Sequence, residues 1–299
     1  MNHSKVSIIV LTWNNYQDTK ECLTSLKNLD YDNYSVILVD NGSMDDSFER
    51  LKNEFQYSKF IFIKNKKNLG YAGGTNIGIK YALEKLNPDF VWILNNDIVV
   101  ASDSLKILVE ALTKNSDIGV AGPTIYWSRT KEIMEQYYCL NLWLGRFLVK
   151  TNLDENEATK IKNEKGKYIG GAAVFLRKEA LEEISLMPEE YFMYNEDAPW
   201  QENLRKTSWQ LMYVGPAKVW HKKAISSGGK KTIMPDYYDS RNFLYFIKKY
   251  YPLWLLYEII MSMVNKIMPK ILRGERLRLK YVLLGLKDFF KGKTGKFQS

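Results

Sequence analysis

Cysteine is scarce in this chain, which has only Cys22 and Cys139 among its 299 residues. Two cysteines give no disulfide framework of the kind that small secreted domains use, and such low usage fits a reducing cytosol. The N-terminal apolar run is too short for a signal peptide and is not followed by a small-residue cleavage site. We therefore expect a cytoplasmic protein.

Long apolar runs are also missing. The most apolar stretch after the N-terminal half, residues 251–272, is interrupted by Glu258, Asn265, Lys266 and Lys270. It falls short of the roughly 20 predominantly apolar residues that span a bilayer. We expect this stretch to lie on a membrane or to pack on the rest of the protein.

Neither of the two common glycine motifs for phosphate binding is present. The sequence has no GxGxxG and no GxxxxGK[ST], and "GKT" at 292–294 lacks both the earlier glycine and a preceding strand. The glycine-rich segment "NLGYAGGTNIG" at 68–78 leads into a predicted helix, where the backbone can approach an anion closely. The alternative interpretation is a tight turn without a ligand.

Positive charge is in excess, with 43 basic and 34 acidic residues and a net charge of +9. Basic and apolar residues alternate in the C-terminal segment, which we predict to be a separate helical tail at 251–299. Nucleic acid, an anionic membrane surface or a phosphorylated lipid would each explain it. An amphipathic helix packed on the core is a further alternative, but the surplus charge favours an interfacial membrane helix. The sequence contains no recognised nucleic-acid module, so we expect no nucleic-acid partner.

Strands and helices alternate through the first hundred residues. Apolar runs at 6–12, 35–43, 59–65 and 89–97 predict buried strands with helical segments between them. This alternation predicts an α/β fold with a parallel sheet, in which ligands bind at the carboxyl ends of the strands. The polar residues at these ends are Thr12, Asn14, Asp40, Asn68 and Asp97.

Asp97 and His221 are candidate metal ligands. Asp97 ends a predicted strand after two asparagines, and Mg²⁺ or Mn²⁺ is commonly held by one or two carboxylates together with substrate phosphates. The alternative for Asp97 is a capped turn. His221 precedes a basic Gly/Ser loop, but a lone histidine is usually a packed or solvated side chain.

The segment "YFMYNEDAP" at 191–199 places two adjacent carboxylates, Glu196 and Asp197, after an aromatic run. Burial among aromatic side chains and repulsion from a second carboxylate both raise the pKa of a carboxyl group toward the range useful to a general base. Pro199 is compatible with the first turn of a helix that begins here. The alternative is a solvated turn.

Taken together, these segments resemble glycosyltransferase family 2, and most closely its rhamnosyltransferase-like branch, which builds bacterial surface polysaccharides. The resemblance covers about residues 5–250 and rests on "VSIIVLTWNN", "VILVDNGSMDDS", "NLGYAGGTNIGI", "VWILNND", "GGAAVFLRKEAL", "PEEYFMYNEDAPW" and "VGPAKVWHKKAISSGG" followed by "YYDSRN". It implies a GT-A fold, a Rossmann-like and mostly parallel sheet flanked by helices. We expect a nucleotide-binding half at 1–123 and an acceptor-binding half at 124–250.

The resemblance also implies roles for individual residues. Asp197 would be the catalytic base, and Asp97 and His221 would bind a divalent metal, Mg²⁺ or Mn²⁺. Leaving-group charge would also be offset by the Ser226–Lys231 loop and Arg241. The acceptor side would include Gly171, Glu196 and Trp200. The donor side would include Thr12, Asn14, Asp40, Asn68, Gly70, Asn95, Asn96 and Arg241.

Two residues depart from the family pattern. Asn95 replaces the first aspartate of the Asp-x-Asp motif that ends at Asp97, which removes a charge near the metal and the ribose. Pro199 stands where the family often has another aspartate that helps engage the acceptor. These changes motivate an alternative, a degenerate relative that binds a nucleotide sugar or glycan without transferring it.

The resemblance leads us to expect an inverting, metal-dependent glycosyltransferase on the inner face of the cell membrane. The donor would be dTDP-rhamnose or a UDP-sugar, with rhamnose favoured, and the acceptor a glycan or lipid-linked glycan. The sequence does not identify the linkage or the oligomeric state.

Overall fold

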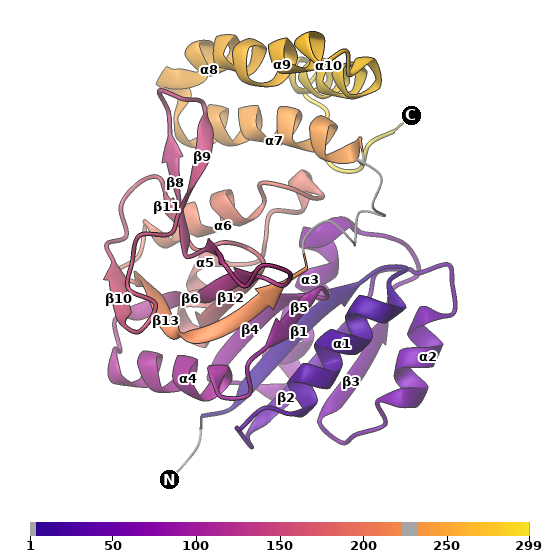
Figure 1. Cartoon of the computed structure of the whole chain (residues 1–299), viewed down its shortest axis with the longest axis vertical. Helices are drawn as coiled ribbons and strands as arrows, with labels where there is room; N and C mark the ends of the chain where they lie inside the picture. The colour runs from indigo at the N-terminus through magenta and orange to yellow at the C-terminus, as the bar shows by residue number, and fades with distance from the viewer. Residues whose placement is uncertain (1–3, 223–232, 299) are drawn as a thin grey trace.

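A computed structural model describes residues 4–222 and 233–298 of the chain (Figure 1). Its main sheet has ten strands, eight of which follow the order β10-β13-β6-β12-β4-β1-β2-β3, while β5 and β7 pair with β13 and β6. Four neighbouring strands form a parallel half, as the apolar runs predicted. These strands are β1 (Val6–Thr12), β2 (Tyr34–Asp40), β3 (Phe60–Lys64) and β4 (Phe90–Asn95).

Helices connect the parallel strands and cover the faces of the sheet (Figure 1). Both faces are therefore buried, which explains why β1 and β2 read as nearly continuous apolar runs. The helices are α1 (Tyr16–Lys27), α2 (Ser47–Glu54), α3 (Gly70–Tyr81), continued by the π-helical turn Ala82–Leu86, and α4 (Ser104–Lys114).

The other half of the sheet is mixed. β12 pairs antiparallel with β4 and with β6, whereas β13 runs parallel to β6. One sheet therefore continues through residue 123, and the division at this residue into a nucleotide-binding half and an acceptor-binding half stays a prediction. The strands are β5 (Ile98–Val100), β6 (Ile118–Trp127), β7 (Ile133–Glu135), β10 (Ala158–Ile161), β12 (Ala173–Arg177) and β13 (Gln210–His221). The helices are α5 (Lys178–Ile184), the 3-10 turn Glu189–Tyr191 and α6 (Asp197–Leu204).

Three strands between residues 137 and 168 form a second sheet. Its order is β11-β8-β9, all antiparallel. The hairpin β8–β9 rises from the body of the protein toward the C-terminal helices (Figure 1). These strands are β8 (Tyr137–Asn141), β9 (Arg146–Lys150) and β11 (Lys167–Tyr168).

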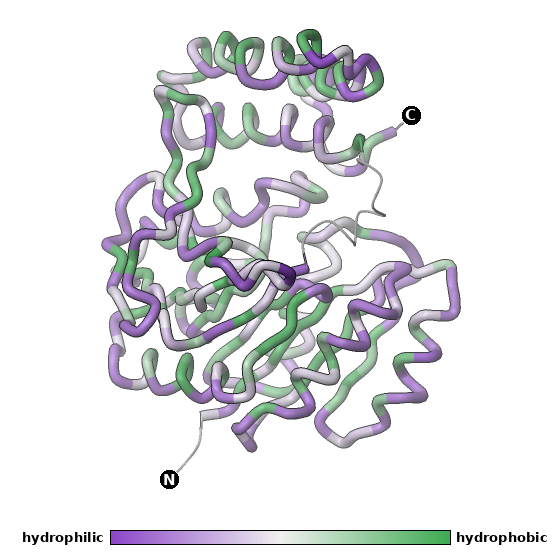
Figure 2. The backbone as a smooth tube through the Cα atoms, in the orientation of Figure 1, coloured by the Kyte–Doolittle hydropathy of each residue, from purple (hydrophilic) through white to green (hydrophobic). Residues whose placement is uncertain are grey.

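The C-terminal helices form a separate layer above α7 (Met234–Tyr250) (Figure 1). Tyr237 in α7 and Asp288 in the last helix share a buried hydrogen bond of 2.8 Å, so the tail packs on the protein. Hydrophobic residues recur along these helices (Figure 2), and many of their side chains are exposed. The layer contains the 3-10 turn Pro252–Trp254, α8 (Leu255–Ser262), the π-helical turn Met263–Ile267, α9 (Met268–Leu272) and α10 (Arg276–Phe290).

None of the helices in the described part of the chain has the length and apolar character needed to cross a membrane.

Candidate active site

The carboxyl ends of β1 and β4 are joined by a small hydroxyl–amide network. Thr12, at the end of β1, shares a 2.8 Å hydrogen bond with Thr19 of α1, and both side chains are buried. The Nδ2 group of Asn96 donates to the Thr19 hydroxyl at 2.9 Å and lies 3.5 Å from that of Thr12. This network fixes Asn96 at the edge where the parallel topology predicts a ligand.

Asp40, at the end of β2, is fully buried and accepts hydrogen bonds from the backbone N–H and the hydroxyl of Ser43. Ser43 in turn accepts from the backbone N–H of Asn14 at 2.8 Å, and the Asn14 side chain accepts from Met44 at 2.8 Å. Asn14 adopts a left-handed backbone with φ of 49°, which asparagine tolerates better than most residues. The loops after β1 and β2 are therefore locked together beside the predicted donor pocket.

Asn41 organises the next part of this edge, although the sequence analysis did not select it. Its buried side chain donates to the carbonyl of Gly70 at 2.9 Å and to the side chain of Asn68 at 3.2 Å, and it accepts from Leu69 at 3.1 Å. A Cβ atom on Gly74 would come within 3.0 Å of this amide and 2.5 Å of Leu11. The sequence signal that could have identified Asn41 is its position as a polar residue directly after the strand β2.

Gly70 lies where the predicted donor edge, the loops at the carboxyl ends of β1, β2 and β4 together with residues 68–70, meets the acidic segment at 191–199. It has φ of +78°, and a Cβ atom there would lie 2.3 Å from the carbonyl oxygen of Phe192. The next residue, Tyr71, donates its backbone N–H to the same carbonyl at 2.6 Å and its hydroxyl to the carbonyl of Gly171 at 3.0 Å. Glycine at position 70 is thus required both by its dihedral angle and by the close approach of Phe192.

Asp97 and His221 meet at the junction of β5 and β13. His221 is paired with Ile98 in the strand register, and its Nε2 atom lies 3.1 Å from Oδ1 of Asp97. Both side chains are buried, and Nδ1 of His221 has no hydrogen-bond partner in the described structure. One carboxylate and one imidazole that converge in this way are a suitable pair of ligands for a divalent ion.

No group of three or more His, Cys, Asp and Glu side chains gathers within residues 4–222 and 233–298 in the way that holds a metal ion. Asp97 and His221 therefore form an incomplete ligand set. The remaining positions suit phosphate oxygens and water, the usual partners of Mg²⁺ in nucleotide sites. Asn95, half-buried at the end of β4, adds an amide where the family motif has a carboxylate.

The acidic segment is held in a strained turn. Phe192, Tyr194 and Asn195 all have left-handed backbones, with φ of 64°, 64° and 63°. Asn242 of α7 is fully buried and donates from Nδ2 to the carbonyls of residues 191, 193 and 194 at 2.9, 2.9 and 2.8 Å. Such strain persists where surrounding contacts impose it, and here α7 supplies those contacts.

Asp197 begins α6 directly after this turn. Its Oδ2 atom accepts the backbone N–H of Gly171 at 3.1 Å, and Oδ1 accepts the N–H of Ala198 at 2.9 Å. The carboxylate is close enough to Gly171 that a Cβ atom there would lie 3.1 Å from Oδ2. Both bonds favour the ionised carboxylate.

Glu196 and Asp197 form a buried pair of unequal carboxyls. Burial and the neighbouring Asp197 raise the pKa of Glu196 to about 8, and Oε2 of Glu196 has no hydrogen-bond partner in the described structure. Burial also raises the pKa of Asp197, but its two backbone N–H donors oppose that effect. Because two adjacent carboxylates do not readily ionise together, the environment favours the protonated form of Glu196, while the two N–H donors favour the ionised form of Asp197.

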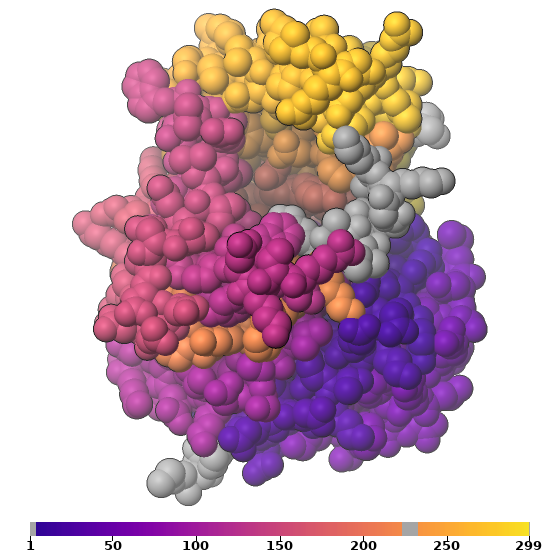
Figure 3. Space-filling model, viewed as in Figure 1, coloured from indigo at the N-terminus to yellow at the C-terminus, as the bar shows by residue number. Residues whose placement is uncertain are grey.

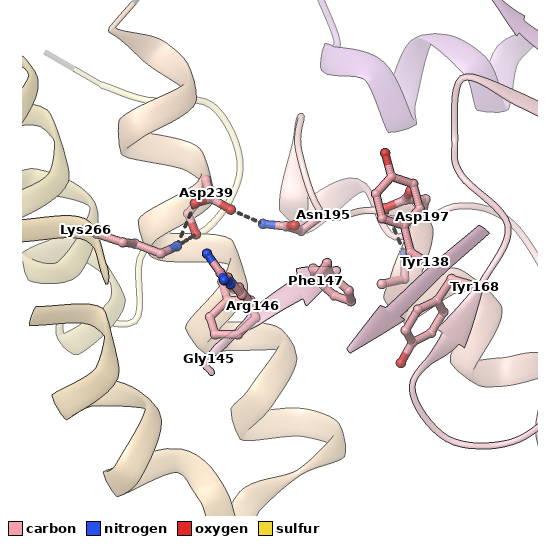
Figure 4. Close-up of a pocket in the computed structure, with 11 residues that line it drawn as sticks. Tyr138, Gly145, Arg146, Phe147, Tyr168, Asn195, Asp197, Asp239 and Lys266 are labelled. Atoms are coloured by element: carbon pink, nitrogen blue, oxygen red, sulfur yellow. Dashed lines mark hydrogen bonds and ion pairs between the residues drawn. The ribbon is translucent and has the colours of Figure 1, made fainter. Parts of the chain in front are cut away.

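A cavity of about 350 Å³ opens beside Asp197. Figure 3 shows a recess between the hairpin β8–β9 and α7, beneath the tail helices. Figure 4 shows Asp197, Tyr138 and Tyr168 on one side of the cavity and Asp239, Lys266 and Arg146 on the other. The other lining residues are Gly145, Phe147, Asn195, Ala198 and Phe243.

Two predicted site residues are buried away from this cavity. Trp200 is fully buried in an apolar cluster with residues such as Leu204 and Tyr213, and it donates its indole N–H to the carbonyl of Ser185 at 2.8 Å. Arg241 is 1% exposed and donates to the carbonyls of Gly295 at 2.8 Å and Tyr191 at 3.3 Å. The acceptor role of Trp200 and the donor role of Arg241 stay predictions.

The remaining predicted site residues fall into two groups. Gly171 and Glu196 lie beside Asp197. The other group lies at the ends of strands or in the loops that follow them: Thr12, Asn14, Asp40, Asn68, Gly70, Asn95, Asn96, Asp97 and His221. The Ser226–Lys231 loop falls outside the described residues.

Comparison with known proteins identifies relatives of this chain. The model of the family "Glycosyl transferase family 2" matches residues 7–185. The N-acetylglucosaminyl-diphospho-decaprenol L-rhamnosyltransferase of Mycobacterium tuberculosis is 25% identical over 238 residues, which cover 74% of this chain and 77% of that protein. A low-salt glycan biosynthesis hexosyltransferase of Haloferax volcanii, Agl10, is 21% identical over 238 residues, 79% of this chain and 73% of that protein.

Solved structures show the same fold. GalNAc-T7 with UDP, GalNAc and Mn²⁺ aligns with a TM-score of 0.70 at 15% identity, covering 97% of this chain and 56% of that chain. The Pyrobaculum calidifontis mannosyltransferase PcManGT, in complex with GDP-Man and Mn²⁺, aligns with a TM-score of 0.62 at 13% identity, covering 98% and 89%. The fold class is therefore GT-A, and the chain belongs to glycosyltransferase family 2.

Proposed function

We propose that this protein is an inverting, metal-dependent glycosyltransferase that moves a sugar from a nucleotide donor to a hydroxyl group of a glycan or lipid-linked glycan. The observation that carries the proposal is Asp197, a buried carboxylate held by two backbone N–H groups at the wall of a cavity. Inverting transfer is a single in-line displacement, and it needs one base on the acceptor hydroxyl. Asp197 is that base.

The unequal carboxyl pair supports this assignment. Glu196, with its pKa raised to about 8, keeps its proton and leaves Asp197 as the ionised partner. A raised pKa also makes Asp197 a better proton acceptor than a carboxylate in water. As the acceptor oxygen attacks, Asp197 takes its proton, the bond between the sugar and the phosphate breaks, and the nucleoside diphosphate leaves.

The donor binds along the carboxyl ends of the parallel strands. Asp40 and Asn14 hold the base and ribose in the loops after β2 and β1, and the Asn41–Asn68–Gly70 network shapes the pocket between them. Asp97 and His221 would hold Mg²⁺ or Mn²⁺, which would offset the negative charge that develops on the leaving diphosphate. Asn95 and Asn96, which precede Asp97 in the chain, would contact the donor.

Rhamnose is our preferred donor sugar, in the form of dTDP-rhamnose, with UDP-sugars next. The M. tuberculosis relative supports this choice through its name as an L-rhamnosyltransferase. That name also describes an acceptor in which the sugar is joined through a diphosphate to a decaprenol. We propose an acceptor of the same general class, used in the synthesis of a cell-surface polysaccharide.

We further propose that the tail rests on the inner face of the cell membrane. The helical layer exposes large apolar side chains, among them Leu253 at 96%, Leu272 at 79% and Leu256 at 73%. Arg273, Arg276 and Lys280 are exposed on the same layer, which suits a bilayer with anionic headgroups. A helical surface of this composition lies in the interface and does not span the bilayer.

A panel of nucleotide sugars with Mn²⁺ tests the proposed function. The expected result is that one of them raises the melting temperature, since a ligand that binds only the native state stabilises it. The same compound should then act as donor, with inversion at the anomeric carbon seen by NMR. A protein that binds a nucleotide sugar but neither transfers nor hydrolyses it would instead be the degenerate relative.

A further inference from the structure

The cavity beside Asp197 has a charged end, and the proposed role of Asp197 as the catalytic base does not explain this end. That end contains Arg146, Lys266 and Asp239, which come from the hairpin, the tail and α7 (Figure 4). We propose that this end binds the phosphate group of an anionic acceptor and that Arg146 determines specificity for it. The inference rests on the proposed function, because it names the class of acceptor used at the same site.

Arg146 is the cation best placed for an external anion. Its side chain is exposed, and it makes no ion pair or hydrogen bond in the described part of the protein, although it lines the cavity. Lys266 is different, because it lies 2.7 Å from Oδ2 of Asp239 and also donates to the Asp239 carbonyl at 2.9 Å. A guanidinium with all its donors free matches the two oxygens of a phosphate.

The carboxyl groups near this end do not cancel the positive charge. Asp239 is offset by Lys266, and its pKa is lowered by that neighbour. Glu258 lies behind Gly145, and burial raises its pKa to about 7, so it is partly neutral at physiological pH. Asp197, on the other side of the cavity, carries the remaining negative charge. Arg146 is thus left as the uncompensated charge.

The rest of the cavity suits a sugar ring. Tyr138, Phe147, Tyr168 and Phe243 line it, and aromatic faces commonly pack against the apolar faces of sugars. A volume of about 350 Å³ lies at the lower end of the range of about 300–1,000 Å³ typical of ligand pockets. An acceptor sugar between the aromatic residues would point a hydroxyl at Asp197 and its phosphate at Arg146.

The exposed apolar surface begins where the charged end stops. Trp143 and Leu144, at the hairpin tip, are 70% and 41% exposed and directly precede the cavity residues Gly145 and Arg146. Trp143 packs edge-on against Trp254 of the tail, with ring centroids 4.9 Å apart. The order from Asp197 outward is therefore aromatic, cationic and apolar, which matches a sugar, a phosphate and a lipid chain.

Binding of two short-chain probes tests the inference. The probes are decyl diphosphate and the neutral decyl glucoside, both below their micellar concentrations, titrated into the full-length protein and followed by tryptophan fluorescence. The donor site is first saturated with the nucleoside diphosphate that raises the melting temperature most. We expect wild-type protein to bind decyl diphosphate more tightly than decyl glucoside.

Arg146→Gln should weaken binding of the diphosphate probe about tenfold or more, the size expected for hydrogen bonds to a charged group, and leave binding of the glucoside unchanged. Arg146→Lys should restore part of the difference. Arg273→Gln is the matched control, since Arg273 is an exposed arginine of the tail that does not line the cavity. Matching melting temperatures would establish that the variants are folded.

The inference is overturned if Arg146→Gln weakens both probes equally, or if Arg273→Gln matches it. Loss of discrimination in a protein that transfers no sugar would support the anion site and reject the proposed function. If the protein transfers sugar but Arg146→Gln still discriminates between the probes as wild type does, the proposed function is supported and the anion site is rejected.

Discussion

The donor edge and the acidic turn, which we define as residues 191–197, are built in different ways. At the donor edge, each polar side chain stands at or just after a strand end, and its partners come mostly from neighbouring loops, as Asp40 with Ser43 shows. At the acidic turn, the strained backbone before Glu196 is held by Asn242, about fifty residues away in sequence. The geometry of the donor edge therefore depends on strand topology, whereas that of the acidic turn depends on the packing of α7.

The largest effect should come from the base itself. We expect Asp197→Asn to lower kcat by about 10²- to 10⁴-fold, the usual contribution of general base catalysis, while the donor dissociation constant stays the same. Single-turnover transfer and donor titration would measure the two quantities separately. Glu196→Gln is the matched control, because it preserves a neutral neighbour, and it should retain most activity at pH 7.

Equal losses in those two variants would contradict our assignment of Asp197 as the ionised partner.

Gly70 tests the contact between the two edges. Gly70→Ala places a Cβ atom 2.3 Å from the carbonyl oxygen of Phe192 and adds the strain of a left-handed alanine. The strain alone costs about 1–2 kcal/mol, so we expect a larger loss in the free energy of unfolding and a lower kcat. Gly274→Ala is the control: its φ is also positive, at +65°, but nothing lies within 4 Å. Denaturant unfolding of both variants separates the clash from the strain.

The comparison would weaken if the two alanine variants lost the same stability.

Two asparagines provide a symmetric test of the two edges. Asn242→Ala removes the side-chain donor to the carbonyls of residues 193 and 194, and Asn41→Ala removes the acceptor of the Leu69 N–H and a second donor to the carbonyl of Gly70. Each should lower the free energy of unfolding by about 1–3 kcal/mol, the cost of unsatisfied buried groups. We expect Asn242→Ala to reduce kcat and Asn41→Ala to raise the donor dissociation constant. Steady-state and binding measurements on both variants decide the matter.

If both variants changed kcat alone or the donor dissociation constant alone, the donor edge and the acidic turn would not have the separate functions that we propose.

The last prediction is a pH dependence of stability. Because the folded protein raises the pKa of Glu196 from its usual 4.5 to about 8, the folded state holds a proton that the unfolded chain has lost. The stabilisation is complete below pH 4.5 and is lost as the pH rises to about 8. Glu196→Gln should therefore gain stability relative to wild type across this interval. Urea unfolding at several pH values would show a constant difference if Glu196 were not the titrating group.

The parallel half of the fold was predictable because strands buried on both faces leave continuous apolar runs, as at residues 6–12. The polar residues at the strand ends were predictable for the same reason. The hairpin β8–β9 was not, since its strands are half-buried and carry no strong period. Asn242 and Arg146 were missed because each acts on a segment distant in sequence, and only the folded arrangement makes them neighbours.

The basic and apolar pattern of residues 251–299 predicts a separate helical tail. The structure instead brings Lys266 of this segment into the wall of the cavity. The alternative, a helix that packs on the core, describes what the structure shows. The favoured interpretation, contact with a membrane, stays a prediction. A periodic pattern of apolar and basic residues does not reveal which of its charges face inward.

The bridge made by Arg241 limits how this protein can be simplified. A single guanidinium contacts the carbonyls of Tyr191, at the start of the acidic turn, and Gly295, four residues before the last residue of the sequence. Cutting away the C-terminal segment to obtain a more manageable enzyme would remove one of the supports of the turn that carries Asp197. A truncated protein that lost activity would then say nothing about lipid binding, and the two properties are better separated by single substitutions on the outer surface.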